Sequence, residues 1–134
     1  MLYSIRHHLT GVILYEVEID DEALCSSNGR RTRLALAKLI RRGVTDFSFA
    51  DLEDGILLNM NLDDCDFSYA KMCDADMRGS SFRYTKLHHA DMRGVRCHSG
   101  TLFQVKGLGT AALEGAETDF MVFGPVGEYH RMGV

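Results

Sequence analysis

A large apolar residue recurs at every fifth position of this chain between residues 45 and 102. These central residues are Phe47, Leu52, Leu57, Leu62, Phe67, Met72, Met77, Phe82, Leu87, Met92, Cys97 and Leu102. A residue that is small in most cases lies two positions before each of them: Thr45, Ala50, Gly55, Met60, Cys65, Ala70, Ala75, Ser80, Thr85, Ala90, Val95 and Gly100. A period of five matches neither the 3.6-residue turn of a helix nor the two-residue repeat of a strand. The backbone must therefore turn once in every five residues, which is typical of a solenoid.

One short motif recurs within this tract, as Ala50-Asp51-Leu52, Ala75-Asp76-Met77 and Ala90-Asp91-Met92, with looser copies between them. On these residues the tract resembles the pentapeptide-repeat family. The resemblance implies a mainly β fold, the right-handed quadrilateral β-helix, in which four pentapeptides make one coil. The tract is then long enough for about three coils.

Four pentapeptides per coil would place residues twenty apart one above another. The central residues Leu52, Met72 and Met92 would form one such column inside the coil. Met60 is bulky for a small position and Cys97 is small for a central one, so both predict local distortion.

The chain divides into three regions around this repeat. Residues 1–44 are predicted to form a β-hairpin over 2–19 and a capping helix over 29–42, and residues 45–104 the β-helix. In residues 105–134 the register is lost. We expect a strand and turns there, which either close the second end of the solenoid or make a homodimer contact.

The predicted helix is strongly basic, with no acid among its cations: Arg30, Arg31, Arg33, Lys38, Arg41 and Arg42. Its apolar stripe is suited to covering the open end of the solenoid, because an open end exposes unpaired strand groups. The alternative is a nucleic-acid or anionic-surface contact. We favour the cap, although the two roles are compatible.

The rest of the composition gives no sign of a catalytic or membrane protein. The formal net charge is -4 and no apolar run approaches the ~20 residues of a membrane span. The first residues lack the apolar core of a signal peptide, so we expect a cytoplasmic protein. The four cysteines form no CxxC pair, and no P-loop, GxSxG or HExxH motif occurs. We expect no cofactor, no metal and no enzymatic activity.

Charge is segregated along the repeat. Nine acids between residues 46 and 76 are opposed only by Lys71, and five cations between residues 78 and 96 only by Asp91. Aspartate at the second motif position often satisfies the turn backbone, which accounts for part of this charge. The candidate partner-binding residues are Glu53, Asp54, Asp63, Asp64, Asp66, Asp74 and Asp76.

Outward aromatic residues provide a second candidate feature. Phe49, Tyr69 and His89 form one column, and Tyr84 lies on another face. Such aromatics can anchor a partner, with Phe49, Tyr69 and Tyr84 as candidate anchors. We favour the alternative that the column lies beneath the hairpin or the C-terminal strand.

These features favour a protein-binding module without catalysis. An acidic rod could imitate duplex DNA, which carries one negative charge per ~1.7 Å of axis. The resemblance implies an inhibitor or modulator of a bacterial nucleic-acid-handling enzyme, with gyrase as the expected partner, and a bacterial or phage origin. One alternative is a scaffolding module without DNA mimicry. The other is direct nucleic-acid binding through the basic helix.

Overall fold

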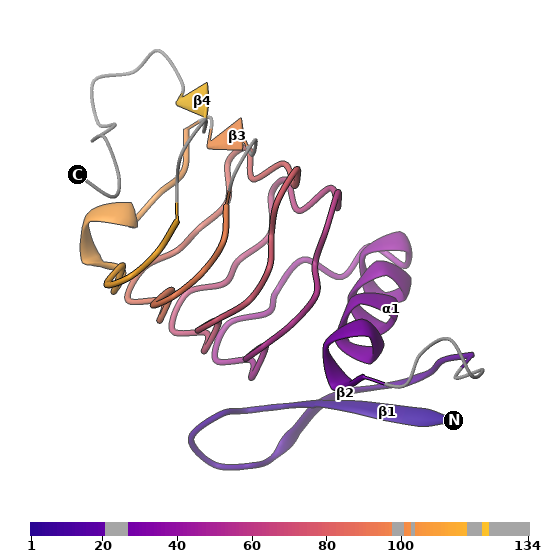
Figure 1. The fold of residues 1–134 in the computed structure, drawn as a ribbon. Helices are drawn as coiled ribbons and strands as arrows, with labels where there is room; N and C mark the ends of the chain where they lie inside the picture. The colour runs from indigo at the N-terminus through magenta and orange to yellow at the C-terminus, as the bar shows by residue number, and fades with distance from the viewer. Residues whose placement is uncertain (21–26, 98–100, 103, 118–121, 124–134) are drawn as a thin grey trace.

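A computed structural model of the chain describes residues 1–20, 27–97, 101–102, 104–117 and 122–123. The named elements are β1 (Leu2–Arg6), β2 (Ile13–Glu18), α1 (Asn28–Arg41), β3 (Thr101–Leu102), the 3-10 turn η1 (Leu108–Thr110) and β4 (Val122–Phe123). Figure 1 shows a stack of coils between α1 and β4, with the β1–β2 hairpin at the α1 end. None of the described helices is long and apolar enough to span a membrane.

The hairpin and the helix form where the sequence predicts them. β1 and β2 pair antiparallel, and their inward residues Ile5 and Val17 are buried. The Oγ of Ser27 accepts the Arg30 N–H at 3.3 Å at the start of α1, which satisfies one of the unpaired donors of the first turn. The apolar stripe of α1 includes Ala35, Leu36 and Leu39, all buried.

Between residues 46 and 96 the backbone pairs with itself at a spacing of twenty residues. The parallel bridges are Asp46–Asp66, Asp51–Lys71, Ile56–Asp76, Asn61–Ser81, Asp66–Lys86, Lys71–Asp91 and Asp76–Arg96. The column of Leu52, Met72 and Met92 is confirmed, because their N-terminal neighbours pair in this register and all three are at most 1% exposed. Four bridges per coil correspond to four walls, each one pentapeptide long.

Each wall ends in a tight turn. Every fifth residue from Phe49 to Gly94 has a positive φ, between 52° and 74°. At most corners the N–H three residues after the central residue donates to its carbonyl, as from Ala70 to Phe67 at 3.0 Å. Aspartate before the central residue supports the turn: Oδ1 of Asp66 accepts the Ser68 N–H at 2.9 Å.

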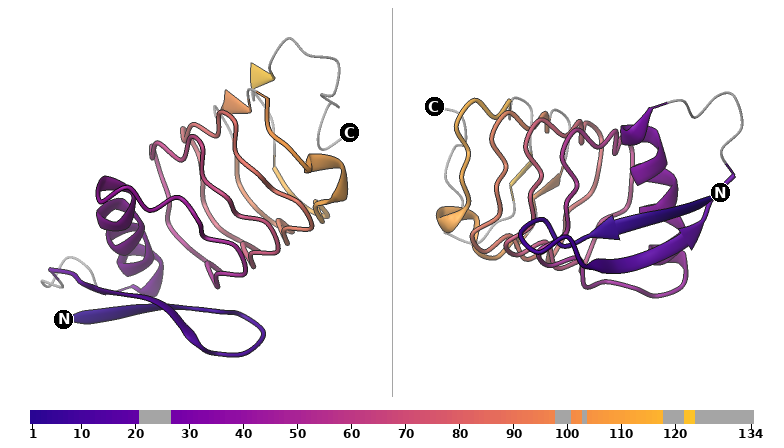
Figure 2. Two further views of the ribbon diagram at one scale, coloured as in Figure 1. Left: turned by 180° about the vertical axis from the view of Figure 1, so that it is seen from behind. Right: turned by 90° about the horizontal axis from the view of Figure 1, so that it is seen from below.

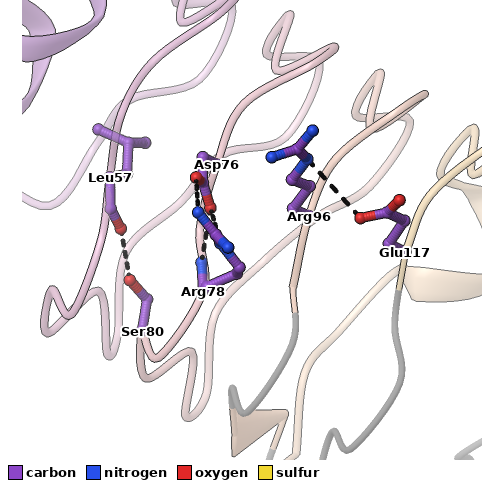
Figure 3. A network of polar contacts seen from close by, with 6 residues as sticks. All are labelled: Leu57, Asp76, Arg78, Ser80, Arg96 and Glu117. Atoms are coloured by element: carbon purple, nitrogen blue, oxygen red, sulfur yellow. Dashed lines mark hydrogen bonds and ion pairs between the residues drawn. The ribbon is translucent and has the colours of Figure 1, made fainter.

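The corner at Met60 is built differently, as its bulk predicted. Ser80, one coil further on and 1% exposed, places its hydroxyl into this turn. Its Oγ donates to the Leu57 carbonyl at 2.6 Å (Figure 3). The same Oγ accepts the Met60 N–H at 3.0 Å. The N–H of Cys97 donates to the carbonyl of Glu117 at 2.7 Å, and the turn after Cys97 lies outside the described residues, so the distortion expected there stays a prediction.

The hairpin and α1 close the first end of the stack. Inside the solenoid, the N–H of Lys71 donates to the Ala50 carbonyl of the preceding coil. In the first coil the Asp51 N–H donates to the Arg6 carbonyl at 2.8 Å instead, and the Ile56 N–H to that of Gly29 at 3.1 Å. Figure 2 shows both elements at this end of the coils. These hydrogen bonds are those that a preceding coil would supply, so α1 and the hairpin act as a cap.

The stacking extends beyond residue 104, where the sequence register was expected to end. Lys86 pairs with Lys106, but Asp91 pairs with Ala112 and Arg96 with Glu117, twenty-one residues on. β3 and β4 pair parallel at the same spacing. The extra residue is accommodated around Gly107 and η1. Gly107 has φ +79°, and a Cβ there would lie 2.4 Å from Nδ1 of His88. This insertion conceals the repeat in the sequence.

Candidate interaction surface

The seven candidate acids do not share one face. Residues twenty apart stack, so residues ten apart lie on opposite sides of a coil. Asp54 and Asp64 therefore occupy diagonally opposite corners. One group gathers around the first corner: Glu53, Asp54, Asp74 and Asp76. The other gathers around the second: Asp63, Asp64 and Asp66.

Cations pair with part of the first group. Nζ of Lys71 lies 2.9 Å from a carboxylate oxygen of Glu53, and this hydrogen bond lowers the pKa of Glu53. Arg78 donates to both oxygens of Asp76, at 2.8 and 2.6 Å (Figure 3), and these bonds lower the pKa of Asp76. Glu53 and Asp76 are thus paired within the molecule, whereas Asp54 and Asp74 lie in no ion pair among the described residues.

The remaining acids of the first group have a role in the turn. Asp54 and Asp74 both have φ of 59°. Aspartate tolerates this left-handed conformation better than most residues with a side chain. The turn therefore accounts for more of the acidic residues than the second motif position alone suggested, and Asp64 of the second group, with φ of 63°, occupies the same turn position.

Four carboxylates gather at the second corner, which we call the acidic corner: Asp46, Asp63, Asp64 and Asp66. Asp46 joins the predicted residues because it lies one coil above Asp66. Sequence reasoning left it out, although the spacing of twenty residues was a sufficient signal. Asp46 and Asp64 are exposed, and the other two are half-buried.

Backbone and hydroxyl groups hold three of these carboxylates, those of Asp46, Asp63 and Asp66. Oδ1 of Asp63 accepts hydrogen bonds from the Ser81 hydroxyl and from the Arg83 N–H, the latter at 2.8 Å. Oδ1 of Asp46 accepts the Ser48 N–H at 3.0 Å. Among the described residues, none of the four carboxylates of the acidic corner lies in an ion pair.

The aromatic column is partly covered by the hairpin, as expected. The ring of His7 stacks on Phe49 with centroids 4.9 Å apart, and Phe49 stacks on Tyr69 at 4.9 Å. Tyr69 stacks on His89 at 5.1 Å and is still 45% exposed. The other candidate anchor, Tyr84, is 48% exposed and lies one coil below Asp64 at the acidic corner.

Two cations of α1 are used in the cap. Nε and Nη2 of Arg33 donate to the Leu58 carbonyl at 3.3 and 3.1 Å. Nζ of Lys38 donates to the Glu18 carbonyl at 2.7 Å. These contacts support the capping interpretation of the basic helix.

The described residues offer little reactive chemistry. They include no group of three or more side chains suited to a metal ion. Cys65, Cys73 and Cys97 are free thiols and buried. Burial raises the pKa of Cys65 and Cys97 to about 12 and that of Cys73 to about 11, so all three are thiols at neutral pH.

A groove of about 200 Å³ between the hairpin and the first coil is lined by His7, Leu14, Tyr15, Asp46, Ser48 and Phe49.

A chain that stacks its own five-residue turns in this way is a solenoid protein. Residues 45–82 and 61–96 match the family model of pentapeptide repeats, with eight copies. Over these residues the chain is therefore similar to the pentapeptide-repeat family.

The solved structures similar to this chain include two pentapeptide repeat proteins. One is the pentapeptide repeat protein Rfr23 from the cyanobacterium Cyanothece 51142, with a TM-score of 0.56 and 29% identity over 58% of this chain and 53% of that one. The match thus spans about half the length of Rfr23. The other is a pentapeptide repeat protein from Nostoc Pcc 7120, with a TM-score of 0.41 and 26% identity over 69% and 85% of the two chains. No curated protein matches this chain in sequence.

Proposed function

We propose that this chain is a non-enzymatic binding module that presents its acidic corner to a basic surface on a partner protein. The proposal assumes the right-handed quadrilateral coil of the family as its rigid support. It is carried by the concentration of four carboxylates outside ion pairs at one corner: Asp46, Asp63, Asp64 and Asp66. Acids on the other walls, such as Glu53 and Asp76, are paired with cations of the same chain.

Packing leaves only the outer walls for a partner. The central residues of the coils are buried together with the small residues that precede them, so the interior has no room for a ligand. Carboxylates fixed by backbone hydrogen bonds lose little freedom on binding, and they attract a basic surface over a distance of about a Debye length. This arrangement supports recognition by charge and shape.

We extend the proposal to DNA mimicry on the ground of the family resemblance. The partner would then be a DNA-processing enzyme, with gyrase as the first to test. The acidic corner places four charges within two coils, which are ~5 Å apart, and so approaches the charge density of duplex DNA over a short length. A scaffolding role without DNA mimicry is the alternative.

The test neutralises the two acids at the centre of the acidic corner. Asp63→Asn and Asp64→Asn together keep the hydrogen-bond acceptor at residue 63 and a residue suited to positive φ at residue 64. We expect at least a tenfold loss in affinity for a captured partner or for purified gyrase, and a weaker dependence on salt. The matched control is Asp54→Asn with Asp74→Asn at the opposite corner. Equal binding by both double variants would reject the acidic corner and favour scaffolding.

A further inference from the structure

The acidic corner continues into a basic segment one coil further along the same edge. Arg83 lies twenty residues after Asp63, and Lys86 pairs with both Asp66 and Lys106. We call Arg83, Lys86 and Lys106 the basic half of this edge. All three are exposed, and among the described residues none of them lies in an ion pair.

Along the solenoid axis, the charge on this edge therefore changes from negative to positive. The column on one wall reads Asp46, Asp66, Lys86 and Lys106 in successive coils. Tyr84 lies at the boundary between the two halves, in the left-handed position of its turn, and is 48% exposed. An exposed aromatic residue is typical of the centre of a protein interface, and charged residues are typical of its rim.

We propose that this edge binds a second copy of the chain in antiparallel orientation. A two-fold axis that crosses the edge between the levels of Asp66 and Lys86 brings each acid opposite a polar group of the other copy. Asp66 then faces Lys86 of the partner subunit, Asp63 faces Arg83 of the partner subunit, and Asp46 faces Lys106 of the partner subunit. Asp64 faces the hydroxyl of Tyr84 of the partner subunit.

The same edge in a parallel orientation would place like charges opposite each other. Only the antiparallel arrangement is self-complementary, and it closes on itself as a C2 interface. Association through charge predicts a strong dependence on ionic strength. The dimer would cover the carboxylates of the acidic corner, so self-association would compete with the partner proposed above. The inference rests on the edge itself and does not require that partner.

The test uses the purified full chain alone. Sedimentation equilibrium at about 0.02 M salt should show a dimer that dissociates at about 0.5 M salt, where the Debye length falls severalfold. Asp66→Lys places two lysines opposite each other across the axis, and Lys86→Glu places two acids opposite each other. Each variant should therefore be monomeric at low salt. Lysine already occupies the equivalent position of another pentapeptide at Lys71, which supports folding of the first variant.

Mixing the two variants separates a dimer contact from a change within one chain. In a heterodimer of Asp66→Lys with Lys86→Glu, both exchanged positions again face an opposite charge. An equimolar mixture should therefore recover at least tenfold tighter association than either variant alone. Asp74→Asn at the opposite corner is the control and should remain dimeric. A wild-type chain that is monomeric at low salt, or a mixture that stays monomeric, would overturn the proposal.

Discussion

The backbone conformation is most restrictive at the left-handed position of each turn. Glycine, asparagine and aspartate suit a positive φ, and many of these positions carry them. Phe49, Tyr69 and Tyr84 do not suit it, yet they adopt φ of about 61–62°. For Phe49 and Tyr69, ring stacking along the column offsets part of the conformational cost.

The side chain of Ser80 replaces a backbone hydrogen bond at the Met60 corner. We predict that Ser80→Ala lowers the free energy of unfolding by about 1–3 kcal/mol, because it leaves the Leu57 carbonyl and the Met60 N–H buried without this partner. Urea denaturation followed by circular dichroism measures the loss. The control is Thr85→Val, at a corner where the Cys65 N–H already reaches the Leu62 carbonyl. A loss at Thr85 as large as that at Ser80 would contradict this account.

At the scale of elements, the hairpin and α1 take the place of a missing coil. They supply the carbonyls of Arg6 and Gly29 as acceptors for the first walls and a guanidinium for the Leu58 carbonyl. Their apolar faces also bury the first core layer, where the ring of Tyr15 meets that of Phe47 edge to face at 5.7 Å. A solenoid needs such an element because each coil is stabilised only by its neighbours.

Arg33 tests the capping role of the helix. We predict that Arg33→Met lowers the free energy of unfolding by about 1–2 kcal/mol, since it keeps the apolar stem and removes both donors to Leu58. Amide hydrogen exchange should accelerate at Ile56, beside the cap, before it does at Arg96. Arg41→Met, at the exposed end of the same helix, should change neither measurement. Uniform acceleration in all coils would argue against a local cap.

At the scale of the whole molecule, charge is distributed wall by wall. Asp76 and Asp91 are each bound by an arginine two residues further on, and these hydrogen bonds lower the pKa of both carboxyls. Among the residues that the structure describes, the acidic corner and the basic half of its edge take part in no such ion pair. We propose that recognition uses this edge with its separated charges and not the walls with paired charges.

These ion pairs predict an acid-dependent loss of stability. A carboxyl whose pKa is lower in the folded chain stabilises the fold above its unfolded pKa of about 3.9. That contribution is lost as the pH falls through the lower folded value. We expect the urea midpoint to fall between about pH 5 and pH 3, and to fall less in Arg78→Ala with Arg93→Ala. Because both arginines are half exposed, the difference should be small. Parallel curves for the two proteins would contradict the assignment.

Much of the coil between residues 45 and 97 could be predicted from the sequence. A pattern that repeats every five residues indicates which side chains face inward, and the four pentapeptides per coil that the family resemblance implies then predict the column of Leu52, Met72 and Met92. The hairpin, the helix and its capping role followed from local pattern and from the need to close an open end.

The arrangement of the surface depends on contacts between coils, which the structure shows. The sequence treats Asp54 and Asp64 as equivalent acids, whereas a coil that closes every twenty residues places them on opposite sides. The inserted residue near Gly107 conceals the last coil because a one-residue shift breaks a strict period without breaking the stacking. The Ser80 hydroxyl in a distant turn and the His7 ring on Phe49 join segments far apart in the chain. These contacts do not recur with the five-residue repeat of the sequence, so they form only once the coils are stacked.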